Sequence, residues 1–409
     1  MTDVAGSATG TASSSVGLRI TGATVATPKG PQRAELRVVA GRIASPDPMP
    51  ASADVGIDAQ GLLIAPGFLD LQTNGAYGID LTSELVEHPE RLWQLAEHLP
   101  SQGVTAFLPT VVSSPSTALE GARRALLQRP ADHLGAEPLG IHAEGPMLAP
   151  AKRGTHDPEH LRDPDVSLIS TWSRADGVTL ATVAPELPGA AEVIRELVAH
   201  GVIVSVGHTD ATYEQVLAAF DAGARAGTHL FNAMSGWTAR EPGAAGALLT
   251  DLRVTVGMIV DDVHLHPATV LAAWRLLGPE RTMLVTDAIA AAGGSGGAAV
   301  LGGRPITVAD GAVRDEQGSL AGSVLTLDRA LRGLVATTGA ETSEALRTVT
   351  STPASLLGDQ DRGHLGAGAR ADLVVLTHDL EVVATFVAGR LAAHPRPDLL
   401  DLPAEVKGT

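Results

Sequence analysis

Eight short apolar segments, each ending in polar or turn residues, constrain the fold of this chain more than any other feature. Most intervals between them hold Ala- and Leu-rich stretches with the periodicity of amphipathic helices. Eight strand-then-helix repeats predict a (β/α)₈ barrel of the TIM type. The apolar segments are residues 68–74, 105–112, 139–146, 179–186, 202–209, 226–233, 255–262 and 282–289. The expected helices include residues 92–99, 116–127, 190–199, 213–222 and 268–277.

Strand-like alternation also occurs near both ends of the chain, from residue 18 to residue 64 and again at residues 371–376 and 382–389. We therefore expect both ends to build one small β-sandwich domain beside the barrel. The predicted division is a disordered tail at 1–17, the small β domain at 18–65 plus 361–409, and the barrel at 66–360. An open doubly wound sheet is the alternative, but no G-x-G-x-x-G motif opens a helix and the helical segments after Ser323 and Thr342 fit it poorly.

Composition limits the classes of function. The 409-residue chain has no cysteine, which excludes a disulfide framework, a thiolate metal site and a cysteine nucleophile. A formal charge of −17 disfavours nucleic acid and anionic membranes as partners. The sequence contains neither a signal peptide at its start nor an unbroken apolar stretch of about 18 residues. We expect a cytoplasmic protein that acts on a small molecule, with metal ligands drawn from His, Asp and Glu.

Four apolar segments end in residues that can bind a metal or transfer a proton: Glu144, His208, His229 and Asp287. The catalytic residues of a TIM-type barrel lie at the C-terminal ends of its strands, so we expect these four to converge. One Glu and two His form a common zinc site that leaves one position for water, and we predict the first three as metal ligands. Asp287 would take a proton from the metal-activated water, although an Asp here could also be a helix cap.

Two further polar residues in the predicted barrel have two interpretations each. His142 lies on the same strand face as Glu144 and either supports that residue or belongs to the core. Glu186 either lines the mouth of the barrel or forms a turn before Pro188. Both residues lie at the ends of predicted strands, so their roles depend on how the barrel closes.

A set of short motifs occurs in a fixed order along almost the whole folded chain. The motifs are PGFLDLQTNG (66–75), HAEGP (142–146), GTH (154–156), GHT (207–209), HLFNAM (229–234), REPG (240–243), VTDA (285–288) and LAGS (320–323). The ordered set resembles the N-acetylglucosamine-6-phosphate deacetylases of the amidohydrolase superfamily. The resemblance implies a metal-dependent barrel with a flanking β domain, usually dimeric. It also implies hydrolysis of N-acetyl-D-glucosamine 6-phosphate to D-glucosamine 6-phosphate and acetate.

Carried over to this chain, the resemblance makes Glu144, His208 and His229 the metal ligands. It makes Asp287 the catalytic acid and base, and His156 the partner of the acetyl carbonyl. It places the phosphate near two backbone groups and two side chains, which are those of Asn232, Ala233, Arg240 and His264. In a homodimer, the arginine and the histidine of this set could reach the neighbouring active site.

The first predicted strand carries Gln72 and Asn74 where the superfamily usually has His-x-His. The amides are weaker ligands than imidazoles, so we expect one divalent ion per chain, Zn²⁺ with Fe²⁺ as the alternative. Two other functions remain open. One is deacetylation of a different acylated amino-sugar phosphate, such as N-acetylgalactosamine 6-phosphate. The other is a metal-free barrel that serves as a scaffold, against which the retention of all four strand-end residues argues.

Overall fold

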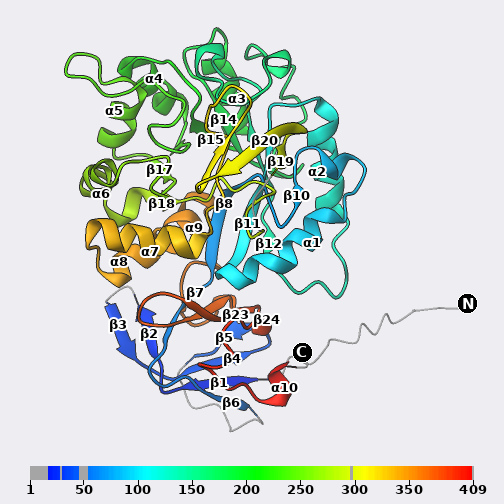
Figure 1. The fold of residues 1–409 in the computed structure, drawn as a ribbon, viewed down its shortest axis with the longest axis vertical. Coiled ribbons are helices and arrows are strands. Elements are labelled where there is room, and N and C mark those ends of the chain that lie inside the picture. Colours follow the sequence, from blue (N-terminus) through cyan, green and yellow to red (C-terminus); the bar gives the residue numbers. More distant parts are fainter. Residues whose placement is uncertain (1–16, 28–29, 46–53, 295–297, 408–409) are drawn as a thin grey trace, which may run out of the picture.

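The structure of the protein, a computed structural model, describes residues 17–27, 30–45, 54–294 and 298–407. Residues 1–16 of the predicted tail therefore lie outside the described residues. Figure 1 shows a barrel in the upper part of the molecule and two smaller sheets below it. None of the described helices combines the length and the apolarity that crossing a membrane requires.

Within the described residues, eight parallel strands form a nearly closed barrel, which confirms the predicted fold class. Each strand pairs with the strand that precedes it in this series. Most strand positions are buried, as expected for parallel strands covered on both faces. The strands are β8 (Phe68–Thr73), β11 (Val104–Val112), β13 (Ile141–Glu144), β14 (Val178–Val183), β15 (Ile203–Val206), β16 (Ala226–Gly227), β17 (Thr255–Met258) and β18 (Thr282–Leu284).

Backbone hydrogen bonds and one buried carboxylate close the barrel between β8 and the residues that follow β18. Asp70 on β8 accepts hydrogen bonds from the backbone N–H and the hydroxyl of Thr286, at 3.3 and 2.5 Å. It also accepts from the backbone N–H of Gln72, and the Gln72 carbonyl accepts from the N–H of Asp287 at 2.9 Å. Burial raises the pKa of Asp70 to about 6. These bonds fix the first strand against the residues that follow the last strand.

Helices cover the outside of the barrel, except α10, which packs beside the small sheets. At α4, Thr212 and Gln215 form a reciprocal capping box, and the helix ends at Gly223 with φ of 118°. The five expected helices are all present, as α1–α4 and α6. The α-helices are α1 (Arg91–His98), α2 (Ser116–Leu127), α3 (Ala190–Ala199), α4 (Tyr213–Ala222), α5 (Gly243–Thr250), α6 (Pro267–Arg281), α7 (Leu327–Thr338), α8 (Thr342–Arg347), α9 (Ser351–Leu357) and α10 (Ala404–Lys407).

The connection between β13 and β14 is an exception to the strand-then-helix pattern. In this fully described stretch, only two short 3₁₀ turns occur, Pro150–Lys152 and Pro158–His160. Four prolines between residues 146 and 164 remove backbone donors and prevent a continuous helix. The chain therefore crosses the barrel mouth here as an irregular segment. Short elements elsewhere in the barrel are η1 (Glu84–Val86), η2 (Leu99–Gln102), β9 (Gly75–Ala76), β10 (Ile79–Asp80) and β12 (Glu137–Pro138).

Strands from both chain ends form two sheets around a second apolar core. β7 (Leu63–Pro66) lies in the larger sheet, and one residue separates it from the first barrel strand. The division into 18–65, 66–360 and 361–409 stays a prediction. One sheet contains β1 (Leu18–Thr21), β4 (Leu36–Val39), β5 (Arg42–Ile43) and β6 (Val55–Asp58). The other contains β7, β2 (Thr24–Thr27), β3 (Gly30–Arg33), β22 (Leu373–Leu376), β23 (Val382–Val387) and β24 (Arg390–Ala393).

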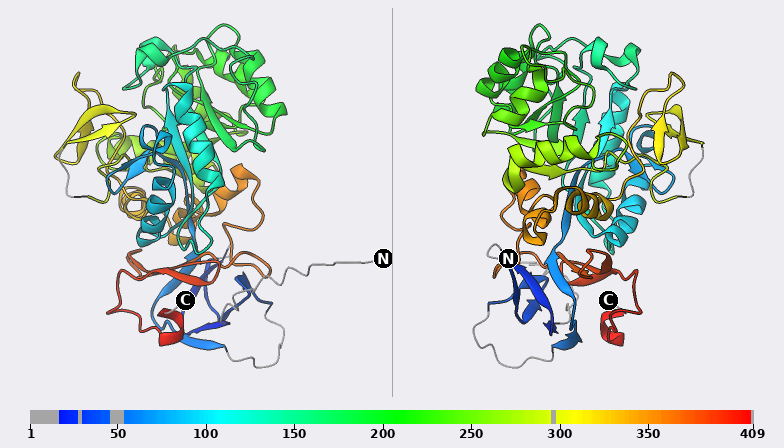
Figure 2. Two further views of the ribbon diagram at one scale, coloured as in Figure 1. Left: turned by 90° about the vertical axis from the view of Figure 1, so that its right-hand side faces the viewer. Right: turned by 60° about the vertical axis from the view of Figure 1, so that its left-hand side comes forward.

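A three-stranded sheet between β18 and α7 was not expected from the sequence. It consists of β19 (Ala298–Leu301), β20 (Arg304–Ala309) and β21 (Ala312–Arg314), and it projects from the side of the barrel in both views of Figure 2. Its apolar residues form a small separate core with Val112 and Ile289 of the barrel. The signal that could have predicted it is the Gly-Gly pair at residues 302–303, where both φ values are positive as a tight hairpin requires.

Candidate metal centre and active site

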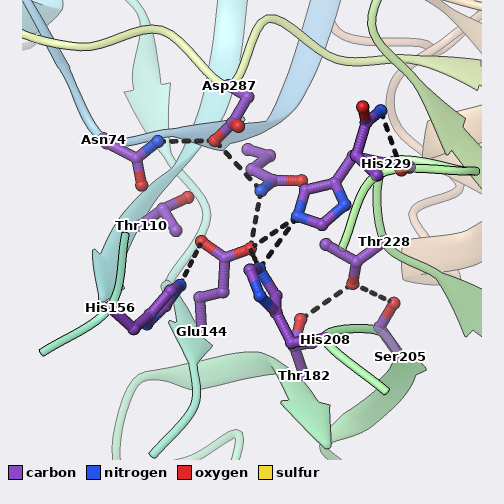
Figure 3. Close-up of polar contacts among 12 residues, drawn as sticks. Asn74, Thr110, Glu144, His156, Thr182, Ser205, His208, Thr228, His229 and Asp287 are labelled. Atoms are coloured by element: carbon purple, nitrogen blue, oxygen red, sulfur yellow. Dashed lines mark hydrogen bonds and ion pairs between the residues drawn. The ribbon is translucent and has the colours of Figure 1, made fainter. Parts of the chain in front are cut away.

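The four strand-end residues converge on one buried site at the C-terminal end of the barrel (Figure 3). Glu144 is the last residue of β13. His208 and His229 each lie two residues beyond the ends of β15 and β16. Asp287 lies three residues beyond β18. All four side chains are buried, although they are polar and lie near the mouth. This arrangement is the one expected for catalytic residues of a (β/α)₈ barrel.

Three ligand atoms meet at a spacing that fits one tetrahedral ion. Glu144 Oε1 lies 3.2 Å from His208 Nε2 and 3.1 Å from His229 Nε2. The two imidazole Nε2 atoms lie 3.1 Å from each other. Ligand atoms bound to one tetrahedral zinc at about 2.0–2.1 Å are separated by about 3.3 Å. The donor set and its spacing therefore suit a divalent ion that keeps a fourth position open.

The hydrogen bonds of the imidazoles show which of their nitrogens can bind a metal. His208 Nδ1 lies 3.0 Å from the carbonyl oxygen of Lys152, so this nitrogen carries the proton and donates it. The lone pair of His208 is then on Nε2, which faces Glu144. His229 also directs Nε2 to this point, and its buried Nδ1 has no hydrogen-bond partner among the described residues. The His208 lone pair and the Glu144 oxygen repel each other at this distance, and either a proton on His229 Nε2 or a cation between the three atoms removes the repulsion.

Protons and a cation compete for this group of ligand atoms. Burial alone would raise the pKa of Glu144, but the imidazoles of His208 and His229 hold it well below its usual range. Burial alone would lower the pKa of His229, but its hydrogen bond to Glu144 and the charge of that carboxylate raise it. Binding of a metal must therefore displace protons, and it should weaken as the pH falls.

A third imidazole, that of His156, lies on the other side of Glu144. Its Nε2 is 3.9 Å from Glu144 Oε2, and together with His208 it forms a group close enough to hold a metal. However, His156 Nδ1 accepts a hydrogen bond of 3.1 Å from the backbone N–H of Ser113, which can only donate. The proton of the neutral ring is therefore on Nε2. Burial lowers the pKa of His156 to about 3, so the ring stays neutral. We assign His156 as a hydrogen-bond donor and prefer His229 as the third ligand.

The amides of the first strand bind carboxylates. Gln72 Nε2 donates to Glu144 Oε1 at 3.0 Å and to Asp287 Oδ1 at 3.1 Å. Asn74 Nδ2 donates to the same Asp287 oxygen at 2.6 Å. The amide of Gln72 must present its nitrogen, because both neighbours are carboxylate oxygens, which only accept. The Gln72-x-Asn74 pair thus positions Asp287 and one metal ligand.

Asp287 has the environment of a proton acceptor. Burial and the charge of Glu144 raise its pKa to about 6, against the opposing effects of His229, His264 and the Asn74 hydrogen bond. Its Oδ1 is occupied by the two amide donors, which leaves Oδ2 for a reacting group. The side chain lines a cavity of about 510 Å³ at the barrel mouth. A carboxylate with a pKa near neutrality can both accept and return a proton there.

The backbone around the site is strained, and neighbouring groups hold it in place. His208, His229 and Asp287 have φ values of 48°, 29° and 49°, in the left-handed region that non-glycine residues rarely adopt. Glu186 accepts hydrogen bonds of 2.5 Å from the Thr209 hydroxyl and from the backbone N–H that follows it. Glu186 lies in a turn before Pro188 and does not line the cavity, and it stabilises the turn that presents His208, a role that the sequence did not indicate.

His142 belongs to a buried polar network beneath the ligand atoms. Its Nε2 lies 2.8 Å from the hydroxyl of Thr182, which lies 2.8 Å from that of Thr228. Ser205 continues the network, at 2.6 Å from Thr228 (Figure 3). Burial lowers the pKa of His142 to about 4, so this ring is neutral. His142 thus occupies a polar layer of the barrel interior, on the strand that ends with Glu144.

The cavity separates the predicted phosphate residues into two groups. Asn232, Ala233 and His264 line the cavity of their own chain, so His264 does not need to come from a neighbouring subunit. Arg240 is exposed and does not line this cavity. It forms no ion pair within the described part of the chain, and Asp251, one candidate partner, pairs with Arg253. The residues predicted to bind the phosphate therefore do not all line one cavity of a single chain.

Several cavity residues were missed by the sequence reasoning. Lys152 and Arg153 add positive charge to the wall, and Leu301 and Leu320 add apolar surface. Arg153 donates to the carbonyl oxygen of His156 at 2.8 Å, so it also orders the irregular segment after β13. Adjacent basic residues in a proline-rich connection after a barrel strand were the signal that could have identified the first two. Leu301 could not be identified from the sequence, because it belongs to the sheet that was not expected.

The chain is similar to known proteins over most of its length. Residues 63–392 match the model of the amidohydrolase family. The chain is 38% identical over 378 residues to the N-acetylglucosamine-6-phosphate deacetylase of Bos taurus, covering 88% of this chain and 91% of that protein. It is 37% identical over 363 residues to the N-acetylgalactosamine-6-phosphate deacetylase of Escherichia coli O157:H7, covering 88% of this chain and 94% of that protein.

Solved structures show the same similarity. A mutant of the N-acetyl-D-glucosamine-6-phosphate deacetylase from Mycobacterium smegmatis, in complex with N-acetyl-D-glucosamine 6-phosphate, superposes with a TM-score of 0.83 at 38% identity, covering 92% of this chain and 100% of that chain. The deacetylase from Pasteurella multocida has a TM-score of 0.83 at 31% identity, covering 91% and 98% of the two chains. The likeness extends over both the barrel and the small sheets.

Proposed function

Because the chain belongs to the amidohydrolase family, among its N-acetylglucosamine-6-phosphate deacetylases, we propose that it hydrolyses N-acetyl-D-glucosamine 6-phosphate. The products are D-glucosamine 6-phosphate and acetate. The observation that carries this proposal is the arrangement around one cavity of a metal-ligand group, a neutral imidazole donor and a carboxylate with a pKa near 6. An amide needs all three functions, since its carbonyl must be polarised, water must be activated and its amine must leave protonated.

Glu144, His208 and His229 would hold one divalent ion, which we propose to be Zn²⁺, with Fe²⁺ as the alternative. When bound, such an ion acts as a Lewis acid and lowers the pKa of water. His156 Nε2–H donates to the carbonyl oxygen of the acetamide, where negative charge develops. Because the pKa of His156 is about 3, this donor keeps its form over the physiological pH range.

Asp287 carries the proton. As the oxygen of water forms its bond to the carbonyl carbon, Asp287 Oδ2 takes the proton that the water loses. The same oxygen then delivers this proton to the amide nitrogen, and the C–N bond breaks to release the amine and acetate. Gln72 and Asn74 keep the carboxylate in place by holding Oδ1.

Deacetylation of N-acetylgalactosamine 6-phosphate is the second candidate, favoured by the similarity to the Escherichia coli O157:H7 enzyme and to a Shewanella relative at 39% identity over 332 residues. The deciding experiment measures acetate release from both epimeric sugar phosphates. We expect kcat/KM to be higher for the gluco epimer. A higher value for the galacto epimer would replace the proposed substrate. Acetate release from neither compound, by protein with one bound ion per chain, would exclude this function and favour the scaffold.

We also propose that the protein acts as a homodimer in which Arg240 binds the phosphate in the neighbouring active site. The support is that Arg240 is exposed, has no ion-pair partner in the described residues and does not line its own cavity. A guanidinium can bind phosphate through two parallel hydrogen bonds. His264, Asn232 and Ala233 would complete the phosphate site from the same chain. The cytoplasmic location stays a prediction of the sequence.

Substituting Arg240 tests this arrangement. Arg240→Ala should lose most of its kcat/KM on the phosphorylated sugar and little on plain N-acetylglucosamine, since only the first has a phosphate to lose. Mixed dimers sharpen the test. A dimer of one Arg240→Ala chain and one Asp287→Asn chain should recover activity, because one site then contains an intact Asp287 and an arginine from its neighbour. No recovery in mixed dimers would show that Arg240 acts within its own chain.

A further inference from the structure

The unexpected β19–β21 sheet contributes directly to the active-site wall. Leu301, at the end of β19, is 8% exposed and lines the main cavity. It packs with Val112, the last residue of β11, in the small core of that sheet. Two hydrogen bonds attach the hairpin to the barrel, from the Gly302 N–H to Asp80 at 2.9 Å and from Arg304 to the Thr155 carbonyl at 3.2 Å. The position of Leu301 is therefore fixed from both sides.

A second, much smaller cavity adjoins the main one at His156. Its volume is about 40 Å³. Val112, Thr155, His156 and Leu301 line both cavities. A site for a single water occupies about 10–15 Å³ on this measure, so the small cavity holds very few heavy atoms. Two buried apolar side chains, Val112 and Leu301, form part of its wall.

The chemistry of the reaction brings the acyl group to this position. This step rests on the proposed function, in which His156 Nε2–H binds the carbonyl oxygen of the substrate. Standard bond lengths place the carbon attached to the carbonyl group about 2.4 Å from that oxygen. The acyl substituent therefore lies next to His156, the residue that both cavities share. We propose that Leu301 and Val112 form an acyl-length pocket, which accepts acetyl and one further carbon and excludes longer chains.

The test compares kcat/KM for the N-acetyl, N-propanoyl and N-butanoyl forms of glucosamine 6-phosphate. The natural protein should use the propanoyl form within about 10-fold of the acetyl form, and the butanoyl form at least about 100-fold less well. Leu301→Ala should raise the ratio of butanoyl to acetyl by about 10-fold or more, because the removed side chain opens the pocket. These ratios are typical of the discrimination between substrates that differ by one carbon in an apolar pocket.

Two further variants keep the test decisive. Leu301→Phe fills the pocket and should lower the ratio of propanoyl to acetyl by about 10-fold while acetate release continues. Ile306→Ala is the matched control, because Ile306 belongs to the same small core and lines neither cavity. It should change the rates for all three acyl groups by the same factor. The control also measures what loosening of the sheet does by itself.

The possible results separate this proposal from the proposed function. No acetate release by the natural protein with its ion bound would overturn both. Normal acetate release, with ratios that Leu301→Ala and Leu301→Phe leave unchanged, would overturn only the acyl-length pocket. Equal changes of the ratio in the Leu301 variants and in Ile306→Ala would also overturn it, since they would reflect the position of the whole sheet.

Discussion

The polar atoms on the two sides of the barrel mouth have different hydrogen-bond partners. On the side of β13, β15 and β16, Glu144, His208 and His229 direct three potential ligand atoms to one point, 3.1–3.2 Å apart. On the side of β8 and β18, the amides of Gln72 and Asn74 donate to the carboxylate of Asp287. Protons and a cation compete for the three atoms of the first side, whereas Oδ1 of Asp287 on the second side already accepts two amide hydrogen bonds.

This difference is what the proposed function requires, namely an ion on one side of the barrel mouth and a proton carrier on the other. Three such atoms in close contact are stable together only when a proton or a cation lies between them. A carboxylate that already receives two amide hydrogen bonds has less to gain from a second cation. The amides of Gln72 and Asn74 also leave Asp287 buried beside Glu144, which is the reason its pKa is raised. The predictions that follow test this contrast, in decreasing order of the effect we expect.

Removing one residue from each side should give opposite results for metal binding. His208→Ala should lose both the ion and activity, by about 10⁴-fold or more, because two ligands hold the ion poorly. Gln72→Ala should keep the ion, since its amide is not a ligand. Metal analysis after dialysis and acetate release measure both effects. His200→Ala, a half-buried histidine elsewhere, is the matched control. Loss of the ion from Gln72→Ala would remove the distinction between the two sides.

Asp287→Asn should keep the ion and reduce kcat by about 10²–10⁴-fold, because an amide cannot carry the proton in either half of the reaction. Single-turnover assays with measured metal content test this expectation. Asp262→Asn makes the same change at an exposed residue near the mouth and should stay within a few-fold of the natural protein. If kcat of Asp287→Asn also stayed within a few-fold of the natural value, another group would have to transfer the proton.

The natural protein should bind one ion tightly per chain, and the double variant Gln72→His with Asn74→His should bind two. Imidazoles supply the lone pairs that the amide nitrogens lack. Elemental analysis and isothermal titration with Zn²⁺ measure the stoichiometry. Two equivalents of metal per chain that stay bound to the natural protein after dialysis would contradict the expectation that only one side of the mouth binds an ion. A double variant that still binds one ion would show that backbone geometry, rather than ligand type, prevents the second site.

The smallest effect that we expect is on the pH dependence of the free energy of unfolding, through Asp70 on the first barrel strand. The folded-state pKa of Asp70 is raised from 3.8 to about 6, so its contribution to stability is present below pH 4 and is lost as the pH rises through 6. The lost stability is on the order of 3 kcal/mol. Asp70→Asn has no proton to lose, so its free energy of unfolding should vary less between pH 4 and 7. Urea unfolding of both proteins at several pH values tests this, and parallel curves would contradict it.

Much of the fold could be predicted from the sequence because its signals are local. Apolar periodicity located the barrel strands, and all five expected helices are present. The β19–β21 sheet was missed because its strands are short and only half apolar, and because they pack on barrel residues that are distant in the sequence. The prolines between β13 and β14 prevented a helix, but they did not indicate where His156 would lie.

The candidate site shows the same division between local and long-range information. Residue type and position at the strand ends were sufficient to select Glu144, His208 and His229, because barrel topology brings such ends together. The sequence could not show that His156 Nδ1 accepts from Ser113, which fixes the proton on the other nitrogen. Nor could it show that His264 lines the cavity of its own chain while Arg240 does not.

The barrel, the chemistry of its strand-end residues and the lack of a second histidine pair can all be deduced from the order of the amino acids. These properties follow from residue type and periodicity, which are fixed before the chain folds. Folding was needed to set the tautomer of each imidazole, the raised pKa of Asp287 and the place of Leu301 in the active-site wall. Each of these depends on which atoms lie within a few ångströms in the folded state. That proximity is set by contacts between segments far apart in the chain.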